Sequence, residues 1–166
     1  MEKIMNTITK LYGDLEITTP SDTELRFCRP FKAPAQLVFD AHTKPELVRR
    51  WLLGPDGWTM PVCEIDLRVG GTFRYVWKKA ERTMGMGGTY LEIEAPNKIV
   101  HTELFDEDWT GGQTTCKLML EEKDGRTEMT LIVAYPSKEA RDGAMATGMA
   151  DGMEGSYERL DSIVAA

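Results

Sequence analysis

The sequence predicts an α+β domain in which a bent antiparallel β-sheet wraps around one long C-terminal helix. Three observations lead to this fold class. From Trp58 onwards, apolar and polar residues alternate with a period of two, in about six consecutive runs separated by turn residues. The stretch from Ser137 to about Val164 is the one long segment with helical spacing. Strands joined by short turns need no crossovers, so they form a meander whose apolar face the final helix can cover.

An N-terminal extension precedes this domain. Residues 1–12 carry apolar side chains at helical spacing, which is compatible with a short docking helix or with a frayed terminus. A strand-like run, "LEITT", follows, and the turn signal Pro20-Ser21-Asp22 comes directly after it. We therefore expect the extension to cover residues 1–23, with a short helix and a strand, and a single domain to cover residues 24–166.

Two short helices are expected between the first two strands of the domain. Pro34 lies in the first turn of "APAQLVFDAHT", and Pro45 opens "PELVRRWLL", which are positions where proline fits a helix. Gly54-Pro55 ends the second helix. Trp51 is predicted to be a core anchor, whereas His42 is expected at the surface or in a cap.

Six strands make up the predicted meander, and their sequences are WTMPVCEIDLRV, TFRYVWKK, TMGMGGTYLEIEAP, KIVHTELFDED, TTCKLMLEEK and RTEMTLIVAYP. Asp124-Gly125 joins the last two and is a strong hairpin signal. The glycines of "MGMGG" (84–88) predict a bulge where the sheet bends.

Glycine and methionine dominate the first half of the C-terminal helix. Ser137 is its predicted N-cap. The expected inward stripe is Met145, Met149, Gly152, Met153, Ser156, Tyr157, Leu160, Ile163 and Val164. In one interpretation, Gly148 and Gly152 thin the helix over a cavity, so that a leucine at either position would intrude on it. In the other, the glycines let the helix approach the sheet closely without any cavity.

The composition excludes several classes of function. A net charge of −7 argues against nucleic acid and anionic membranes as main partners. No apolar run approaches the roughly 20 residues that span a bilayer, so membrane insertion is not expected. The N-terminus lacks the order of a signal peptide, which makes the cytoplasm the default location.

The three cysteines, Cys28, Cys63 and Cys116, are odd in number and far apart, so we expect reduced and mostly buried thiols. The sequence shows no H-x-x-x-H, C-x-x-C or clustered carboxylate spacing, and no phosphate-binding loop. These patterns predict neither a metal site nor a cofactor.

Several stretches resemble one superfamily of proteins, and they are RPFKAPAQLVFDAHTKPELVRRWL, DLRVGGTFRYVW, GTYLEIEAPNKIVHTE, LMLEEKDGRTEMTL and GMADGMEGSYERLDSIV. Together they resemble the SRPBCC (START-like, helix-grip) superfamily over roughly residues 24–165. Within it, the chain is similar to the branch named after the C-terminal domain of the heat-shock protein 90 ATPase activator. The most specific matches are Phe31, Ala33, Pro34, Val38 and Phe39, then Pro45, Glu46 and Trp51, then the stretch from Val69 to Tyr75.

The resemblance implies the helix-grip fold, which agrees with the order of elements. Members of the superfamily bind lipids, hormones or polyketide-like molecules in a cavity, some are cyclases or hydrolases, and some bind a chaperone. The branch carries no shared catalytic motif to transfer, and a fold hosts many functions. The branch name is therefore not taken as this chain's activity.

The residues favour a protein that binds a small hydrophobic or aromatic molecule between the sheet and the C-terminal helix, without a catalytic set. Aromatic and methionine walls with a few polar tips suit such ligands. The alternative for each of these residues is a plain core position. The candidate ligand-binding residues are Phe73, Tyr75, Trp77, His101, Trp109, Tyr135, Met145, Met149, Gly152 and Tyr157.

Two other functions stay open. His101 and Glu103 are the candidate catalytic residues of a cyclase- or dehydratase-type enzyme, because a His–Glu pair can act as acid and base. That requires the face of Ile99, His101 and Glu103 to point inward, and the opposite face is equally credible. A chaperone-linked interaction module would need an exposed apolar patch instead. An edge strand or the N-terminal segment is also compatible with a homodimer.

Overall fold

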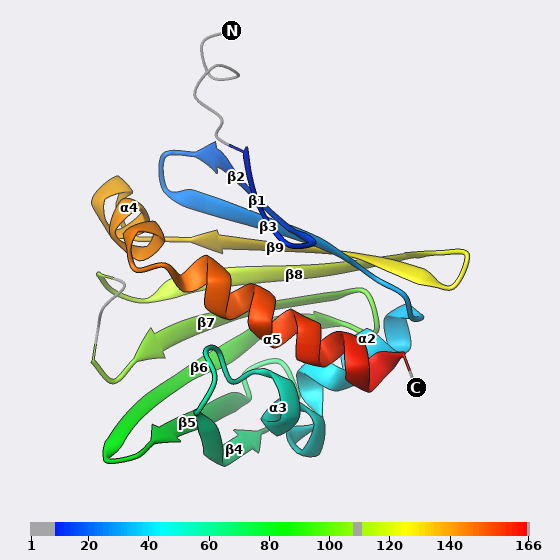
Figure 1. Cartoon of the computed structure of the whole chain (residues 1–166), viewed down its shortest axis with the longest axis horizontal. Coiled ribbons are helices and arrows are strands. Elements are labelled where there is room, and N and C mark those ends of the chain that lie inside the picture. The colour runs from blue at the N-terminus through cyan, green and yellow to red at the C-terminus, as the bar shows by residue number, and fades with distance from the viewer. Residues whose placement is uncertain (1–8, 108–110, 166) are drawn as a thin grey trace, which may run out of the picture.

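A single nine-stranded antiparallel sheet forms the body of the protein (Figure 1), with strand order β1-β2-β3-β9-β8-β7-β6-β5-β4. The computed structural model describes residues 9–107 and 111–165. The strands are β1 (Thr9–Tyr12), β2 (Leu15–Ser21), β3 (Glu24–Phe31), β4 (Thr59–Ile65), β5 (Thr72–Lys79), β6 (Arg82–Glu94), β7 (Lys98–Phe105), β8 (Thr114–Lys123) and β9 (Arg126–Ala134). The strands from β4 to β9 are the six predicted from the period of two, and the hairpin at Asp124-Gly125 is confirmed.

Both short helices lie between β3 and β4, as predicted. They are α2 (Ala35–Thr43) and α3 (Pro45–Trp51), and Pro45 occupies the first turn of α3. Trp51 is buried, and its indole Nε1–H donates a hydrogen bond of 2.8 Å to the carbonyl oxygen of Ala41. Trp51 is therefore the core anchor that the sequence indicated.

The C-terminal helical segment is divided in two, where the sequence predicted one continuous helix. These parts are α4 (Lys138–Ala146) and α5 (Met149–Val164). Ser137 caps α4, since its side chain accepts a hydrogen bond from the backbone N–H of Ala140. Gly148 has a φ of +78°, a left-handed conformation that suits glycine and ends the first helix. Helix α5 then runs diagonally across one face of the sheet (Figure 1).

The positions of Gly148 and Gly152 correct the idea that both thin the helix over a cavity. A Cβ at Gly148 would meet nothing within 4 Å, so a larger residue there would be strained by its backbone and would not fill a cavity. A Cβ at Gly152 would lie 3.3 Å from Cδ of Pro55. Gly152 therefore lets α5 pack closely against the loop after α3, whereas the second interpretation expected the close approach to be to the sheet.

The N-terminal end of the described chain is a strand, whereas the sequence suggested a helix. Residues 9–12 form β1, which pairs with β2 at the edge of the sheet. The rest of the expected helix lies outside the described residues. Pairing with β2 gives the backbone of this short segment its hydrogen-bond partners. A helix of this length would be only marginally stable in water, because its first turn is costly to form.

The glycine-rich stretch 84–88 pairs regularly with β5, and the register shift of β6 lies between Tyr90 and Glu92, against β7. The prediction of a bulge at the glycines is therefore wrong.

Among the described residues, no helix combines the length and apolarity that a membrane span needs.

Candidate functional site

The face of β7 that carries His101 points toward α5. Residues paired across antiparallel strands share a face of the sheet. His101 pairs with Cys116 on β8, Cys116 pairs with Val133 on β9, and Val133 pairs with Leu25 on β3. On β3, that same face includes Phe31, whose ring contacts Tyr157 of α5 with centroids 5.8 Å apart. Ile99, His101 and Glu103 therefore lie on the covered face, which settles the direction that the sequence left open.

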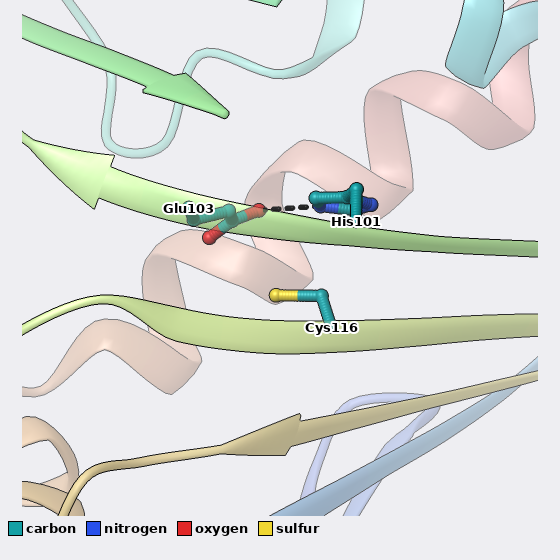
Figure 2. A group of neighbouring side chains, drawn as sticks. All are labelled: His101, Glu103 and Cys116. Atoms are coloured by element: carbon teal, nitrogen blue, oxygen red, sulfur yellow. Dashed lines mark hydrogen bonds and ion pairs between the residues drawn. The ribbon is translucent and has the colours of Figure 1, made fainter. Parts of the chain in front are cut away.

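His101, Glu103 and Cys116 form one cluster on this face (Figure 2). The ring Nε2 of His101 lies 3.0 Å from Oε2 of Glu103. Since a carboxylate only accepts, Nε2–H is the donor of this hydrogen bond. The other ring nitrogen, Nδ1, is buried and has no hydrogen-bond partner in the described structure. In the neutral ring Nδ1 is therefore an unpaired acceptor.

Solvent reaches the pair even though it lies on the face that α5 covers. The side chain of His101 is 17% exposed and that of Glu103 is 27% exposed. The neighbouring Cys116 is fully buried, and its Sγ lies 4.0 Å from the hydroxyl of Thr114. The cluster thus has one buried side and one side that water reaches.

Aromatic rings surround His101. The ring of Phe73 meets it edge-on with centroids 5.3 Å apart, and that of Tyr90 lies at 6.3 Å. Phe73 also contacts Tyr75, which in turn contacts Trp77. The row of Phe73, Tyr75 and Trp77 that the sequence predicted is therefore continuous with the polar pair.

Gly88 makes room for this arrangement. A Cβ at this position would overlap the carbonyl oxygen of Thr102 on β7 and would lie 2.7 Å from the ring of Phe73. Only glycine lets β6 pass under the Phe73 ring at this distance. This close approach is the physical reason for part of the glycine-rich stretch.

Burial controls the acid–base behaviour of the surrounding groups. Burial, together with the nearby Glu103 charge, raises the pKa of the Cys116 thiol well above its ordinary value. Burial likewise raises the pKa of Tyr75, Tyr135 and Tyr157, each of which also lies within electrostatic reach of Glu103. Their raised pKa values keep the thiol and the three phenols neutral at physiological pH. Glu103 is the carboxylate that acts electrostatically on all four of these groups.

The other candidate ligand-binding residues differ in exposure. Phe73, Tyr75, Tyr135 and Tyr157 are buried, whereas Trp77, Met145 and Met149 pack against the core and stay partly exposed. Gly152 contacts the loop at Pro55, as described above. Trp109 lies outside the described residues. His42, expected at the surface or in a cap, is only partly exposed: its Nδ1 lies 2.8 Å from the carbonyl oxygen of Val38, and its ring packs edge-on against Trp51.

Two surface hollows lie away from the cluster. One of about 400 Å³ lies beside the β8–β9 turn, and one of about 210 Å³ lies on β4 and β5 beside Phe73. Neither is lined by His101, Glu103 or Cys116. Solvent reaches the cluster through the partly exposed side chains of His101 and Glu103, and not through either hollow.

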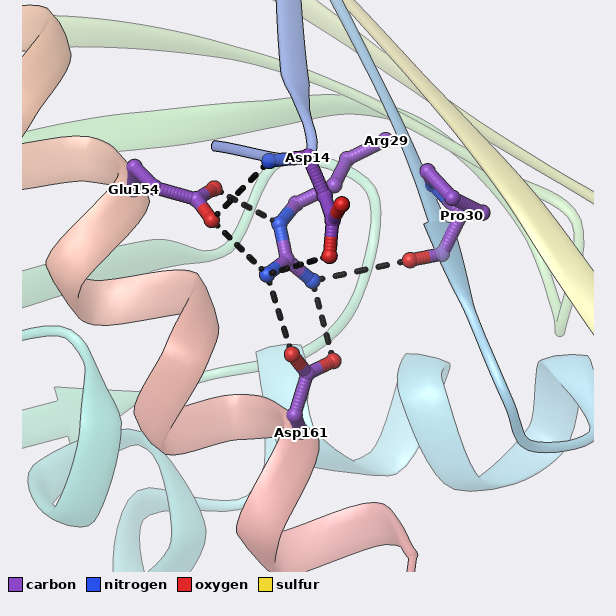
Figure 3. A network of polar contacts seen from close by, with 5 residues as sticks. All are labelled: Asp14, Arg29, Pro30, Glu154 and Asp161. Atoms are coloured by element: carbon purple, nitrogen blue, oxygen red, sulfur yellow. Dashed lines mark hydrogen bonds and ion pairs between the residues drawn. The ribbon is translucent and has the colours of Figure 1, made fainter. Parts of the chain in front are cut away.

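A second polar cluster on the covered face centres on Arg29 (Figure 3). Its side chain is 1% exposed, and all five of its N–H donors have acceptors. Glu154 and Asp161 of α5 each accept two of these hydrogen bonds, and the carbonyl oxygen of Pro30 accepts the fifth at 3.5 Å. A carboxylate oxygen of Asp14 lies 3.8 Å from Nη2.

Burial alone would lower the pKa of the Arg29 guanidinium, but the hydrogen bonds to Glu154 and Asp161 raise it above its ordinary value. The sequence interpretation did not identify this cluster. A signal was present, because Arg29 follows Leu25 and Phe27 and precedes Phe31 at the same period of two. A charged residue in phase with a buried face predicts a buried ion pair.

Comparisons with known proteins agree with the fold. Residues 32–165 match the family model described as activator of Hsp90 ATPase homolog 1-like protein. A crystal structure of a Rhodobacter sphaeroides protein is 38% identical, covers 91% of this chain and 98% of that chain, and has a TM-score of 0.85. A solution structure from Staphylococcus epidermidis is 26% identical, covers 87% of this chain and 91% of that chain, and has a TM-score of 0.77.

A solution structure described as an AHSA1-like protein from Aeromonas hydrophila shares the fold at 18% identity, with 81% of this chain and 93% of that chain covered and a TM-score of 0.62. No curated protein matches the chain.

Proposed function

The chain belongs to the family of activator of Hsp90 ATPase homolog 1-like proteins, and we propose that it binds a small aromatic molecule between the sheet and α5. The observation that carries this proposal is the unpaired Nδ1 of His101, whose ring is hydrogen-bonded to Glu103 and contacts the rings of Phe73 and Tyr90. A buried polar atom without a partner costs about 1–3 kcal/mol, so native proteins rarely keep one without a use.

The aromatic row supplies the apolar contact. Phe73, Tyr75 and Trp77 stand side by side on β5 with ring centroids 5.0 and 5.8 Å apart. The ring of Phe105 stacks against Trp77 at 6.4 Å. Flat ligands gain from such walls, because ring faces and edges offer both area and favourable electrostatics.

Methionines supply the adaptable side of the site. Met145 lies in the last turn of α4, and Met149 is the first residue of α5. Both side chains pack against the core and stay partly exposed. Methionine adapts to irregular shapes because it is unbranched and polarisable. This supports a site that accepts related ring systems rather than one exact shape.

The polar pair selects a ligand that donates a hydrogen bond. In the neutral ring, Nδ1 of His101 accepts, and Glu103 carries a negative charge that repels anionic ligands. A phenol or an aromatic amine meets both conditions. A carboxylate or a phosphate meets neither, which narrows the proposal to neutral ring systems with a hydroxyl or N–H group.

A matched pair of probes tests this proposal. We expect 2-naphthol to bind the full-length protein saturably at one site, and its methyl ether to bind about 3- to 10-fold more weakly, which corresponds to one hydrogen bond. Tryptophan fluorescence and native mass spectrometry measure the affinity and the stoichiometry. The preference for naphthol should vanish in His101→Phe, which keeps a ring but has no acceptor.

Leu104→Gln is the matched control, because Leu104 is a half-exposed neighbour on the opposite face of β7. It should bind both probes as the wild type does. Failure of both probes to bind saturably would refute a binding site on this face, and an unchanged preference in His101→Phe would refute the role of His101.

A second candidate function is acid–base catalysis by His101 and Glu103, favoured by their 3.0 Å separation on a covered face. A chemical role would appear as turnover that Glu103→Gln abolishes while probe binding persists. An interaction module receives less support, because the large exposed apolar residues in the described part of the chain are distributed over several elements: Leu11, Leu37, Leu67, Val69, Leu91 and Leu104.

A further inference from the structure

We propose that His101, Glu103 and Cys116 bind a divalent transition-metal ion, with Zn²⁺ as the ion that fits them best. One ligand atom from each residue lies within 4.8 Å of the other two. The three side chains offer a nitrogen, an oxygen and a sulfur, which is a donor set that Zn²⁺ accepts in proteins. Mg²⁺ and Ca²⁺ prefer oxygen ligands only and are disfavoured here.

The backbone places the three residues so that small side-chain movements suffice. His101 and Cys116 are direct partners across β7 and β8, and Glu103 lies two residues along on the same face (Figure 2). Bond lengths of about 2.0–2.3 Å put the ligands of a tetrahedral Zn²⁺ roughly 3.3–3.6 Å apart. The existing separations of at most 4.8 Å come within reach through changes in rotamer, without movement of the strands.

Charge balance also favours the ion. Cys116 must lose its proton to bind, and that proton passes to solvent. A thiolate, a carboxylate and a neutral imidazole together carry two negative charges, which Zn²⁺ neutralises. His101 would ligate through one ring nitrogen and keep its proton on the other. A neutral complex is the form that a largely buried face tolerates best.

Three protein ligands leave one tetrahedral position open. Sites of this kind hold a water molecule or a substrate in the fourth position, whereas structural zinc sites use four protein ligands. The open position would lie near the aromatic residues that contact His101. Metal binding does not depend on the small-molecule site proposed above, because it needs only the three ligands.

Sequence spacing predicted no metal site here, for a physical reason. Familiar metal motifs place ligands one helical turn apart or around a tight turn. In this cluster, the ligands come from two paired strands, and Cys116 is brought to His101 only by the register of β7 and β8. Such a cluster can be recognised only once the pairing register of the two strands is known.

Co²⁺ provides a direct test on the full-length reduced protein. Titration with Co²⁺ alone should give one equivalent of a tetrahedral complex, with intense visible bands and a thiolate-to-metal charge-transfer band in the near ultraviolet. Zn²⁺ should displace it at one equivalent. Cys116→Ser should remove the charge-transfer band, and His101→Gln or Glu103→Gln should weaken Co²⁺ binding by about 10- to 100-fold.

Cys63→Ser is the matched control, because Cys63 is also a buried, free thiol but lies on β4 outside the cluster. Its spectrum with Co²⁺ should equal that of the wild type. Circular dichroism confirms that each variant is folded. The site is refuted if the wild type gives no charge-transfer band, or if the band survives in Cys116→Ser. Naphthol binding in metal-free protein is scored separately, so that a failure of one proposal leaves the other measurable.

Discussion

The two polar clusters on the covered face of the sheet differ in how completely their hydrogen bonds are met. Arg29 is 1% exposed, and every one of its five N–H groups has an acceptor. His101 is 17% exposed, and one of its two ring nitrogens has no partner in the described structure. Both clusters lie on the face of the sheet that α5 covers, so their location on this face does not explain the difference.

This difference separates a structural role from a binding role. The Arg29 cluster joins β3 to α5 through Glu154 and Asp161, and the backbone N–H of Asp14 donates to Glu154 at 3.2 Å. Arg29 has no N–H group left to donate to a ligand. The His101 cluster keeps an acceptor, a carboxylate and a thiol within a few ångströms, and solvent reaches it. An unpaired hydrogen-bonding group, such as Nδ1 of His101, is therefore a better indicator of a binding site than the burial of a polar side chain.

Replacing Arg29 should have the largest effect on stability. Arg29→Met leaves the carboxylate of Glu154 largely buried without its cation, which should lower the free energy of unfolding by about 3–5 kcal/mol. Urea denaturation at neutral pH measures the change. A loss below about 1 kcal/mol would show that the cluster does not anchor α5.

The double variant Arg29→Met, Glu154→Leu sharpens this result. Removal of both buried charges leaves only Asp161, which is 43% exposed, without its hydrogen-bonded cation. Well-packed apolar residues often replace buried ion pairs without loss. We expect the double variant to recover most of the stability that the single variant loses. If it is no more stable than Arg29→Met, the cost arises from lost packing rather than from the unpaired charge.

Acid should weaken the protein through His42, and this effect must be separated from the two clusters. Burial lowers the pKa of His42 to about 4 from its ordinary 6.5. The unfolded chain therefore takes up a proton first, so the contribution of His42 is complete above pH 6.5 and is lost as the pH falls toward 4.

The expected loss over this range is about 1–3 kcal/mol, because His42 is partly exposed to solvent. His42→Gln should flatten the dependence of unfolding free energy on pH between 6.5 and 4 by this amount. Parallel pH profiles for the two proteins would contradict the burial of the neutral ring.

Replacing His101 should have the smallest effect on stability. His101→Phe removes an unpaired buried acceptor, and Glu103 remains partly hydrated. We expect the free energy of unfolding to stay within about 1 kcal/mol of the wild type, or to rise. A loss comparable to that of Arg29→Met would mean that His101 is as structural as Arg29 and would weaken the comparison.

The sequence was sufficient to predict the strands from β2 onwards and the short helices, because local patterns determine them. The alternation in "TFRYVWKK", the prolines at the starts of α2 and α3, and Asp124-Gly125 each act within a few residues. The break at Gly148 was missed, because methionine and glycine spacing is continuous across it. Its positive φ is a property of the backbone that composition does not reveal.

The candidate site was predictable only in part. His101 and Glu103 were identified as an i, i+2 pair, but the direction of their strand depends on register with β8, which no local pattern reports. The nearness of Cys116 depends on the same register. Arg29 was overlooked because its partners, Glu154 and Asp161, lie more than 120 residues away.

The pairing of β3 with β9 has a consequence for how the protein is made. Arg29 lies opposite Met129, and Glu24 lies opposite Ala134. Strand β3 therefore leaves the ribosome about a hundred residues before the strand that completes it, and α5, which binds Arg29, follows later still. Chains with such distant pairings fold slowly and expose strand edges meanwhile. During synthesis, the hairpin of β2 and β3 therefore stays without its partner strand β9 for some time. Its unpaired edge is accessible to chaperones during that time.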